Sequence, residues 1–251
     1  MLDSDVNLPK VTMMGCPCFA VSESTLEKQL MHFINNSISG YSVAINAEKI
    51  QKYKSDPQLR NVIDSSIYPY PDGAGAVLGI KWLHNLASEK INMPIRVLEI
   101  ANKNSLAIFI VGAKEHIHNN GVAIIKERYP NINFVGNMHG YHSEEEIIAE
   151  VTLAKPQIIM LAMGSPRQEI FANKLIKQCQ YGFAVGCGGA LDILAGELKR
   201  APEFFINNNL EWLYRLVQEP WRWKRQLFLP LFFTKLQMLR ISTKLFKSGK
   251  K

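Results

Sequence analysis

Short apolar runs rich in valine and isoleucine recur along the chain and alternate with longer segments in which apolar residues follow helical spacing. Each run ends near a glycine or an asparagine, and the runs are residues 41–46, 106–112, 132–136, 157–164 and 181–186. The segments with helical spacing include residues 115–129, 143–154 and 167–178. Strands that are apolar throughout must be covered on both sides. The alternation therefore predicts a parallel sheet with helices on both faces, an α/β fold of Rossmann-like architecture.

In a fold of this kind, ligands bind outside the carboxyl ends of the strands, where loops and helix N-termini meet. The residues that follow the apolar runs therefore form the candidate site. They are Asn46, Gly112, Gly136, Gly164 with Gln168 and Glu169, and the group Gly186, Gly188, Gly189 and Asp192.

Gly186, Cys187, Gly188 and Gly189 lead from the last apolar run into a short helical stretch at residues 191–195. Glycines allow a ligand to approach the backbone, and a helix start offers free N–H groups and a positive dipole end to a phosphate. The stretch matches neither a Walker A motif nor the GxGxxG dinucleotide fingerprint. On local sequence alone, a phosphate cradle and a plain tight turn explain these glycines about equally well.

A second junction between a strand and a helix lies at residues 164–169. Ser165 is predicted to be the N-cap of this helix, with Pro166 as its first residue. Arg167 and Gln168 carry hydrogen-bond donors that a ligand at the strand ends would meet, although a solvated helix start explains them as well.

Asp72 lies in a Pro-Asp-Gly sequence, residues 71–73, of the kind that β-turns prefer. An aspartate at a bend with few neighbours is also well placed to take a proton from a substrate hydroxyl. A turn residue and a general base therefore remain alternative interpretations of Asp72.

Positive charge is concentrated at the C-terminal end. Residues 221–251 contain nine lysines and arginines, no aspartate or glutamate, and six tryptophans and phenylalanines. Because the whole chain carries a charge of +7, residues 1–220 sum to −2. A near-neutral body with a basic, aromatic tail predicts docking on an anionic membrane surface and a lipid-linked substrate.

We divide the chain into a Rossmann-like domain, residues 1–200, and a helical, membrane-docking appendage, residues 201–251. A nucleic-acid-binding protein is the alternative from another class, supported only by the high overall isoelectric point.

Arg215 lies in an apolar stretch of helical spacing, residues 210–216, whose bulk is predicted to belong to the core. It faces a basic run that includes Arg222 and Arg225. Converging guanidinium groups would bind a diphosphate and offset the charge that develops as it leaves. A solvated basic face beside lipid headgroups explains these arginines equally well.

Composition also disfavours several kinds of site. The four cysteines have no paired CxxC spacing and no neighbouring histidines, so we expect buried apolar packing, with no disulfide, metal site or cofactor. His84, His116 and His118 lack ligand spacing and are expected to be solvated.

The first five residues are acidic and polar, and no apolar run reaches the roughly 18 residues that a spanning helix needs. We therefore expect a cytoplasmic protein, peripheral on the inner face of the plasma membrane.

Six stretches, taken together, resemble the WecG/TagA/CpsF glycosyltransferases (glycosyltransferase family 26), over most of the chain. They are, in order, VAINAEK at 43–49, YPDGAG at 70–75, YPNINFVGNMHGY at 129–141, AMGSPRQEI at 162–170, VGCGGALDILAGELKRAP at 185–202 and LEWLYRLVQEPWRWKR at 210–225. The first and the fourth are similar to the forms found in the branch that transfers N-acetylmannosaminuronic acid.

The resemblance implies an inverting, UDP-sugar-dependent enzyme that adds a hexosamine-type sugar, N-acetylmannosaminuronic acid or N-acetylmannosamine, to a polyprenyl-diphosphate-linked acceptor. It also implies a C-terminal appendage that touches the membrane and supplies arginines to the active site, so that a metal is not obligatory. The implied roles are Asp72 as the base for the acceptor hydroxyl, Asn46 beside the donor, Gln168 and the glycines from Gly186 to Gly189 at the nucleotide, and Arg215, Arg222 and Arg225 on the diphosphate.

The chain departs from the family pattern in two places. Ala44 stands where many members have a threonine, and the segment 82–98 has Ala87, Lys90, Asn92 and Met93 where the family has Arg, Gly and Asp-Leu. Because the second segment bears on donor recognition, the transferred sugar stays open, with UDP-glucose or another hexosyl donor as the alternative. The acceptor glycan, the polysaccharide pathway and assembly into a homo-oligomer stay open as well.

Overall fold

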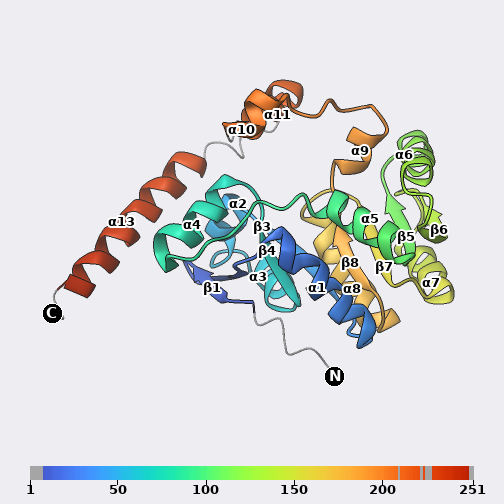
Figure 1. The fold of residues 1–251 in the computed structure, drawn as a ribbon, viewed down its shortest axis with the longest axis horizontal. Coiled ribbons are helices and arrows are strands. Elements are labelled where there is room, and N and C mark those ends of the chain that lie inside the picture. Colours follow the sequence, from blue (N-terminus) through green and yellow to red (C-terminus); the bar gives the residue numbers. More distant parts are fainter. Residues whose placement is uncertain (1–7, 209, 221–222, 224–227, 249–251) are drawn as a thin grey trace.

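A parallel sheet of six strands, in the order β4-β3-β8-β7-β5-β6, forms the centre of the protein (Figure 1). The computed structural model describes residues 8–208, 210–220, 223 and 228–248. The strands are β3 (Gly40–Ile45), β4 (Tyr68–Pro71), β5 (Ala107–Gly112), β6 (Asn133–Met138), β7 (Ile158–Ala162) and β8 (Phe183–Gly186).

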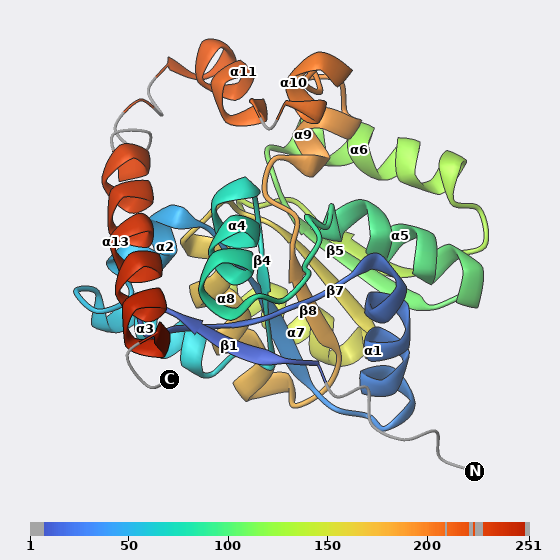
Figure 2. The same ribbon diagram turned by 60° about the vertical axis from the view of Figure 1, so that its left-hand side comes forward.

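Helices cover both faces of this sheet (Figures 1 and 2). One face packs against α1 (Glu23–Asn35), α5 (Met93–Asn104) and α6 (Glu115–Arg128), and the other against α3 (Pro57–Asp64), α7 (Glu144–Ala154) and α8 (Arg167–Cys179). Alternate strand residues supply the two cores: Ile108 and Ile110 belong to the first, and Phe109 and Val111 to the second. The predicted α/β fold is confirmed.

The ends of two helices show how local sequence sets these boundaries. Ser143 Oγ accepts a hydrogen bond from the amide of Glu146 at 3.2 Å, and Glu146 Oε2 accepts one from the amide of Ser143 at 2.8 Å, a capping box that starts α7. Helix α8 begins at Arg167 with Pro166 as its N-cap. The predicted N-cap at Ser165 is therefore wrong by one residue.

Two parts of the fold were not predicted. An antiparallel hairpin, β1 (Lys10–Met13) with β2 (Cys16–Phe19), lies beside the sheet. Strand β4 has the sequence Tyr-Pro-Tyr-Pro and pairs with β3 at the edge of the sheet. Proline cannot donate to a ladder, but an edge strand leaves one side unpaired and tolerates it. Strand β4 ends at Pro71, directly before Asp72.

The chain beyond β8 continues through α9 (Ala190–Leu194), α10 (Glu203–Asn207), α11 (Glu211–Gln218) and α13 (Phe228–Ser248). Helix α13 packs on α4 (Ala74–His84) and α2 (Ala47–Lys52), and Phe232 and Leu236 are fully buried there. A Cβ atom at Gly75 would lie 3.2 Å from the Phe232 ring, so the absent side chain lets the two helices approach closely. The Arg240 guanidinium lies 5.1 Å from the centre of the Trp82 ring.

Helix α11 does not enter the core. It has no buried side chain, and Trp212, Leu213 and Val217 are exposed. Tyr214 of this helix contacts Phe205 of α10, with ring centroids 5.2 Å apart. The prediction that the bulk of residues 210–216 is core is therefore wrong, because helical spacing reveals an apolar face but not what covers it.

Among the helices of the described residues, none combines the length and the apolar character that crossing a membrane requires.

Candidate active site

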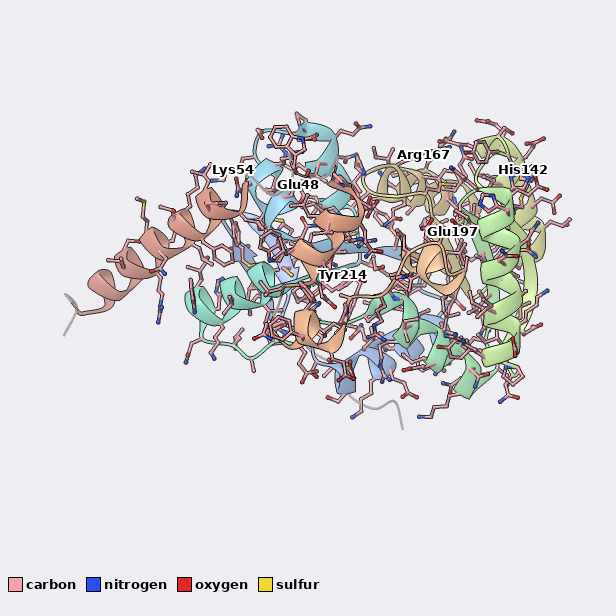
Figure 3. All side chains as sticks on the ribbon, turned by 90° about the horizontal axis from the view of Figure 1, so that it is seen from above. Glu48, Lys54, His142, Arg167, Glu197 and Tyr214 are labelled. Carbon is pink, nitrogen blue, oxygen red and sulfur yellow. The ribbon has the colours of Figure 1, made fainter. Side chains whose placement is uncertain are left out.

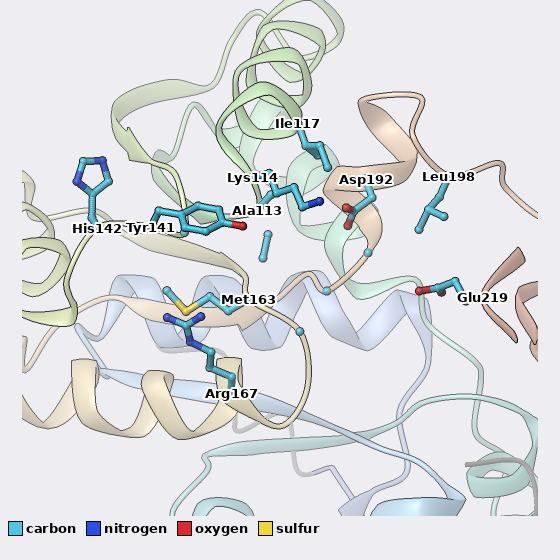
Figure 4. Close-up of a pocket in the computed structure, with 15 residues that line it drawn as sticks. Ala113, Lys114, Ile117, Tyr141, His142, Met163, Arg167, Asp192, Leu198 and Glu219 are labelled. Carbon is cyan, nitrogen blue, oxygen red and sulfur yellow. The ribbon is translucent and has the colours of Figure 1, made fainter. Parts of the chain in front are cut away.

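A cavity of about 590 Å³ opens at the carboxyl ends of β5, β7 and β8, within the range of roughly 300–1,000 Å³ typical of ligand pockets. Of the predicted site residues, Gly164, Gly188, Gly189 and Asp192 line it. Lys114, Tyr141, Arg167 and Glu219 supply most of its other polar side chains. Figure 4 shows the Lys114 ammonium and the Asp192 carboxylate pointing toward one another across the cavity, with Tyr141 and Glu219 on opposite sides.

The glycine turn after β8 is shaped by its packing against α8. Gln168 is buried, and its Oε1 accepts a hydrogen bond from the amide of Gly188 at 3.1 Å. A Cβ atom at Gly186 would collide with Gln168 Nε2. Gly186 and Gln168 therefore lie behind the cavity, and the Gly188 amide is already bonded within the protein. Part of the glycine pattern thus belongs to the tight turn itself.

Arg215 of α11 reaches the same turn. A Cβ atom at Gly189 would collide with Arg215 Nη2, so only glycine allows the guanidinium to lie here. Arg215 Nε also lies 3.4 Å from Glu219 Oε2. Seen from above, α11 with Tyr214 lies between α2 with Glu48 and the region of Glu197 after α9 (Figure 3). Arg222 and Arg225, the other two predicted diphosphate ligands, lie outside the described residues.

Asp192 carries the most informative electrostatic environment of the cavity. Burial raises the pKa of its carboxyl, the carboxylates of Glu219 and Glu197 raise it further, and the Arg215 guanidinium opposes them. A neighbouring cation and a ligand hydroxyl group would each favour the ionised carboxylate. The cavity thus offers carboxylate acceptors beside the cations Lys114 and Arg167, with Arg215 next to its glycine turn. This combination suits the sugar hydroxyls and the diphosphate of a nucleotide.

Gly112 and Gly136 lie beneath the cavity and do not line it. A Cβ atom at Gly112, whose φ is +116°, would collide with the carbonyl of Ala162, and one at Gly136 would collide with the Phe109 ring. Close packing between neighbouring strands therefore accounts for both glycines.

His118 supports this floor from α6 and is buried, not solvated as predicted. Its Nδ1 lies 2.8 Å from the carbonyl oxygen of Gly112, and its Nε2 lies 2.9 Å from Asn137 Oδ1. The imidazole thus ties the ends of β5 and β6 together. Its burial escaped prediction because residues 115–129 have mixed polar and apolar positions.

Asp72 and Asn46 lie at the same edge of the sheet but on the other side of β8. The amide of Asp72 donates to the carbonyl oxygen of Ile45 at 2.8 Å, which ties the end of β4 to the end of β3. In the order β4-β3-β8, Asp72 is two strands from the glycine turn, or roughly 10 Å across the sheet at about 4.8 Å per strand. Asp72 is not among the residues that line the cavity. Asn46 caps α2, its Oδ1 accepting from the amide of Lys49 at 3.0 Å.

Lys90 lies close enough to Asp72 for their two charges to interact. Lys90 forms an ion pair with Glu211 of α11. Burial lowers the pKa of Lys90, the charge of Asp72 opposes this shift, and that of Arg200 adds to it. The segment that departs from the family pattern therefore places a cation near the candidate base and links it to α11.

Glu169 lies in the interior and not at the cavity. Its Oε1 accepts from Lys49 Nζ at 2.5 Å, and both side chains are almost fully buried. Lys49 was not among the predicted residues, because its helix, α2, mixes polar and apolar positions and only the packing of α2 against its neighbours buries this side chain. Lys114 was missed as well, and it follows Gly112 by two residues, where the rule on strand ends would have found it.

All four cysteines are buried and free, as expected. Burial raises the pKa of the Cys187 thiol, which lies in the glycine turn, to about 12, so the thiolate is absent at neutral pH. Across the described part of the chain, no three His, Cys, Asp or Glu residues are grouped so that they could hold a metal ion.

Comparison with known proteins decides the family. Residues 11–245 match the Glycosyl transferase WecG/TagA/CpsF family. The chain belongs to this family. An N-acetylglucosaminyldiphosphoundecaprenol N-acetyl-beta-D-mannosaminyltransferase of Bacillus subtilis (strain 168) is 33% identical over 205 residues, and that of Bacillus spizizenii is 30% identical over 206 residues. Each alignment covers 80% of this chain and 80% of the relative.

As a member of the WecG/TagA/CpsF family, the protein is a hexosyltransferase, which confirms the expected enzyme class. Four of the six stretches that carried the resemblance contribute residues to the cavity lining, and two of these four also hold the glycine turn and Arg215. Asp72 lies within a fifth stretch. The individual roles of these residues remain predictions, which the geometry supports to different degrees.

The raised pKa of Asp192 gives a pH-dependent prediction. Because the folded protein holds this proton more tightly than the unfolded chain, the contribution of Asp192 to stability is largest at low pH and is lost as the pH rises through the folded-state pKa. Asp192→Asn should therefore raise the melting temperature at pH 7.5, and the gain should shrink as the pH approaches 3.8, the ordinary value for aspartate. Scanning calorimetry across this range checks it. Glu150→Gln, at an exposed site on α7, is the control and should show no such trend.

Proposed function

We propose that this glycosyltransferase moves N-acetylmannosamine or N-acetylmannosaminuronic acid from a UDP-sugar to an acceptor linked to a polyprenyl diphosphate. The printed names of both relatives describe N-acetylmannosaminyl transfer to N-acetylglucosaminyldiphosphoundecaprenol, a lipid-linked acceptor. The observation that carries the proposal is the cavity, whose carboxylates and cations suit a nucleoside diphosphate, at the same sheet edge as Asp72.

The proposed reaction is a single displacement with inversion at the anomeric carbon. The acceptor hydroxyl oxygen attacks this carbon, Asp72 takes the hydroxyl proton, and the bond to UDP breaks with its electron pair on the diphosphate. Arg215, together with Arg222 and Arg225, stabilises the charge on the departing diphosphate. Asn46 lies beside the donor sugar.

The donor nucleotide occupies the cavity in this proposal. Gly164, Gly188, Gly189 and Asp192 contact it directly, since they line the cavity. Four further predicted donor residues act from behind the lining by shaping it. They are Gly112, Gly136, Gln168 and Gly186. Glu169 is instead paired with Lys49 in the interior.

The acceptor side faces a membrane through an appendage made of residues 201–251. Exposed apolar side chains lie along α11 and α13, and the last thirty-one residues carry nine basic side chains and no acidic one. These apolar residues are Trp212, Leu213, Val217, Leu231, Met238 and Ile241. An apolar face beside basic residues suits an anionic lipid surface, and we place the enzyme on the inner face of the plasma membrane. A nucleic-acid-binding role has no support from the family.

The donor test uses a lipid-diphosphate-linked N-acetylglucosamine acceptor with UDP-N-acetylmannosamine, UDP-N-acetylmannosaminuronic acid or UDP-glucose, and measures UDP release. We expect turnover with one of the first two donors. Turnover with UDP-glucose alone would contradict the proposed sugar, and no turnover by the folded protein would contradict the proposed substrate class.

Asp72→Asn should lower turnover by about 10²- to 10⁴-fold, the usual contribution of a general base, and should leave the Kd for UDP nearly unchanged. An Asp72→Asn enzyme of normal activity would remove Asp72 from the mechanism.

Vesicle binding tests the membrane face. The wild-type protein should sediment with vesicles that contain anionic phospholipid more strongly than with neutral vesicles. Trp212→Ser/Val217→Ser should weaken this binding, because it removes two apolar side chains from the proposed surface. Leu153→Ser is the matched control, since Leu153 is 79% exposed but lies on α7. Equal binding by the double variant and the wild type would show that α11 is not part of the surface.

A further inference from the structure

A buried ion pair joins α2 to α8 beneath the edge of the sheet that carries the site. Lys49 is 5% exposed and Glu169 4%. The Lys49 ammonium donates to Glu169 Oε1 at 2.5 Å and to the carbonyl oxygen of Ala44 in β3 at 2.9 Å. One ammonium group therefore holds a helix, a strand and a second helix together.

The pair lies beneath the neighbouring strands β3 and β8, because α8 packs on both strands and the Lys49 ammonium is bonded to β3. The residue before Glu169 is Gln168, which binds the Gly188 amide in the turn after β8. Successive residues of α8 are therefore linked to the two sides of the site. Gln168 contacts the glycine turn, and Glu169 reaches the end of β3 by way of Lys49.

The end of β3 in turn positions both predicted reacting residues. Asn46 accepts a hydrogen bond from the amide of Lys49 itself at 3.0 Å. Asp72 is bonded through its amide to the carbonyl oxygen of Ile45, at 2.8 Å. Displacement of Lys49 would therefore be transmitted to Asn46 directly and to Asp72 through one backbone hydrogen bond.

Stability alone gives a poor reason for this pair. Removing two charges from water costs so much that apolar side chains of similar size are often as stabilising or more so. Glu169 also has a second oxygen, Oε2, that is buried and finds no hydrogen-bond partner among the described residues, which adds to the cost. An arrangement this costly is better explained by the geometry that it imposes, because the ammonium needs Glu169 Oε1 and the Ala44 carbonyl oxygen to be within hydrogen-bond distance at the same time.

We propose that Lys49 and Glu169 are positioning residues, which hold Asp72 and Asn46 at a fixed distance from the glycine turn of the donor cavity. The proposal rests on the proposed function, because it assigns the two sides of the pair to the acceptor and the donor of one reaction. Neither side chain contacts the substrate, so Glu169 acts through its neighbours and not as a donor ligand.

The double variant Lys49→Met/Glu169→Leu separates positioning from stability. Its melting temperature should equal or exceed that of the wild type, and its Kd for UDP should change by less than about threefold. Its kcat should nevertheless fall by about 10- to 100-fold, the loss expected when reacting groups are misplaced by about 1 Å. The matched control is Lys103→Met/Glu27→Leu, which removes an ion pair of 2.7 Å between α5 and α1, helices that contribute no residue to the cavity lining. Its kcat should match that of the wild type.

Equal kcat in the double variant and the wild type would overturn the proposal, as would a loss of UDP binding with kcat intact. If the double variant does not fold, Glu169→Gln provides the test, because it keeps the shape of the side chain and removes its charge. We expect this variant to have a lower kcat and an unchanged affinity for UDP. An unchanged kcat would overturn the proposal. Failure of the wild-type enzyme to transfer any sugar is a separate outcome, which contradicts the proposed function and not the positioning of these groups.

Discussion

Apolar side chains on both sides of every central strand constrain where this protein can carry polar chemistry. Helices must cover both faces of the parallel sheet, so the carboxyl edge is where loops, helix starts and polar side chains can meet a ligand. The cavity, the glycine turn, Asn46 and Asp72 all lie there. The donor cavity lies at the ends of β5, β7 and β8, and Asp72 lies at the end of β4, with β3 between them.

The donor cavity and Asp72 must therefore be held at a fixed distance from each other. Gln168 and Glu169 of α8, and Lys49 of α2, form the connection beneath β8. Above it, α11 contributes Arg215 to the glycine turn and Glu211 to the ion pair with Lys90. The part of the chain that faces the membrane in our proposal thus contacts both sides of the site. Helix α11 would then both bind the lipid surface and cover the site.

The fold followed from the sequence where burial was uniform, and so did part of the site. Strands β5 and β7 were located to within about two residues, because continuous runs of valine and isoleucine are typical of buried strands. The rule that ligands bind at the carboxyl ends of strands placed Gly164, Gly188, Gly189 and Asp192 at the cavity. Strand β4 was missed because its two prolines argue against a strand unless its position at the sheet edge is known. The burial of Lys49, Glu169 and His118 is a tertiary property, since each lies in a segment of mixed polarity. The apolar face of α11 was visible in the sequence, but its lack of a covering partner was not.

Hydrogen–deuterium exchange with and without UDP tests most directly whether the cavity, together with α11, is the nucleotide site. The account predicts that UDP slows amide exchange after β5, β7 and β8, at residues 112–118, 163–170 and 187–194, and in α11, while the amino edge of the sheet is unaffected. Protection confined to other parts of the molecule, or no protection at a saturating concentration of UDP, would contradict it.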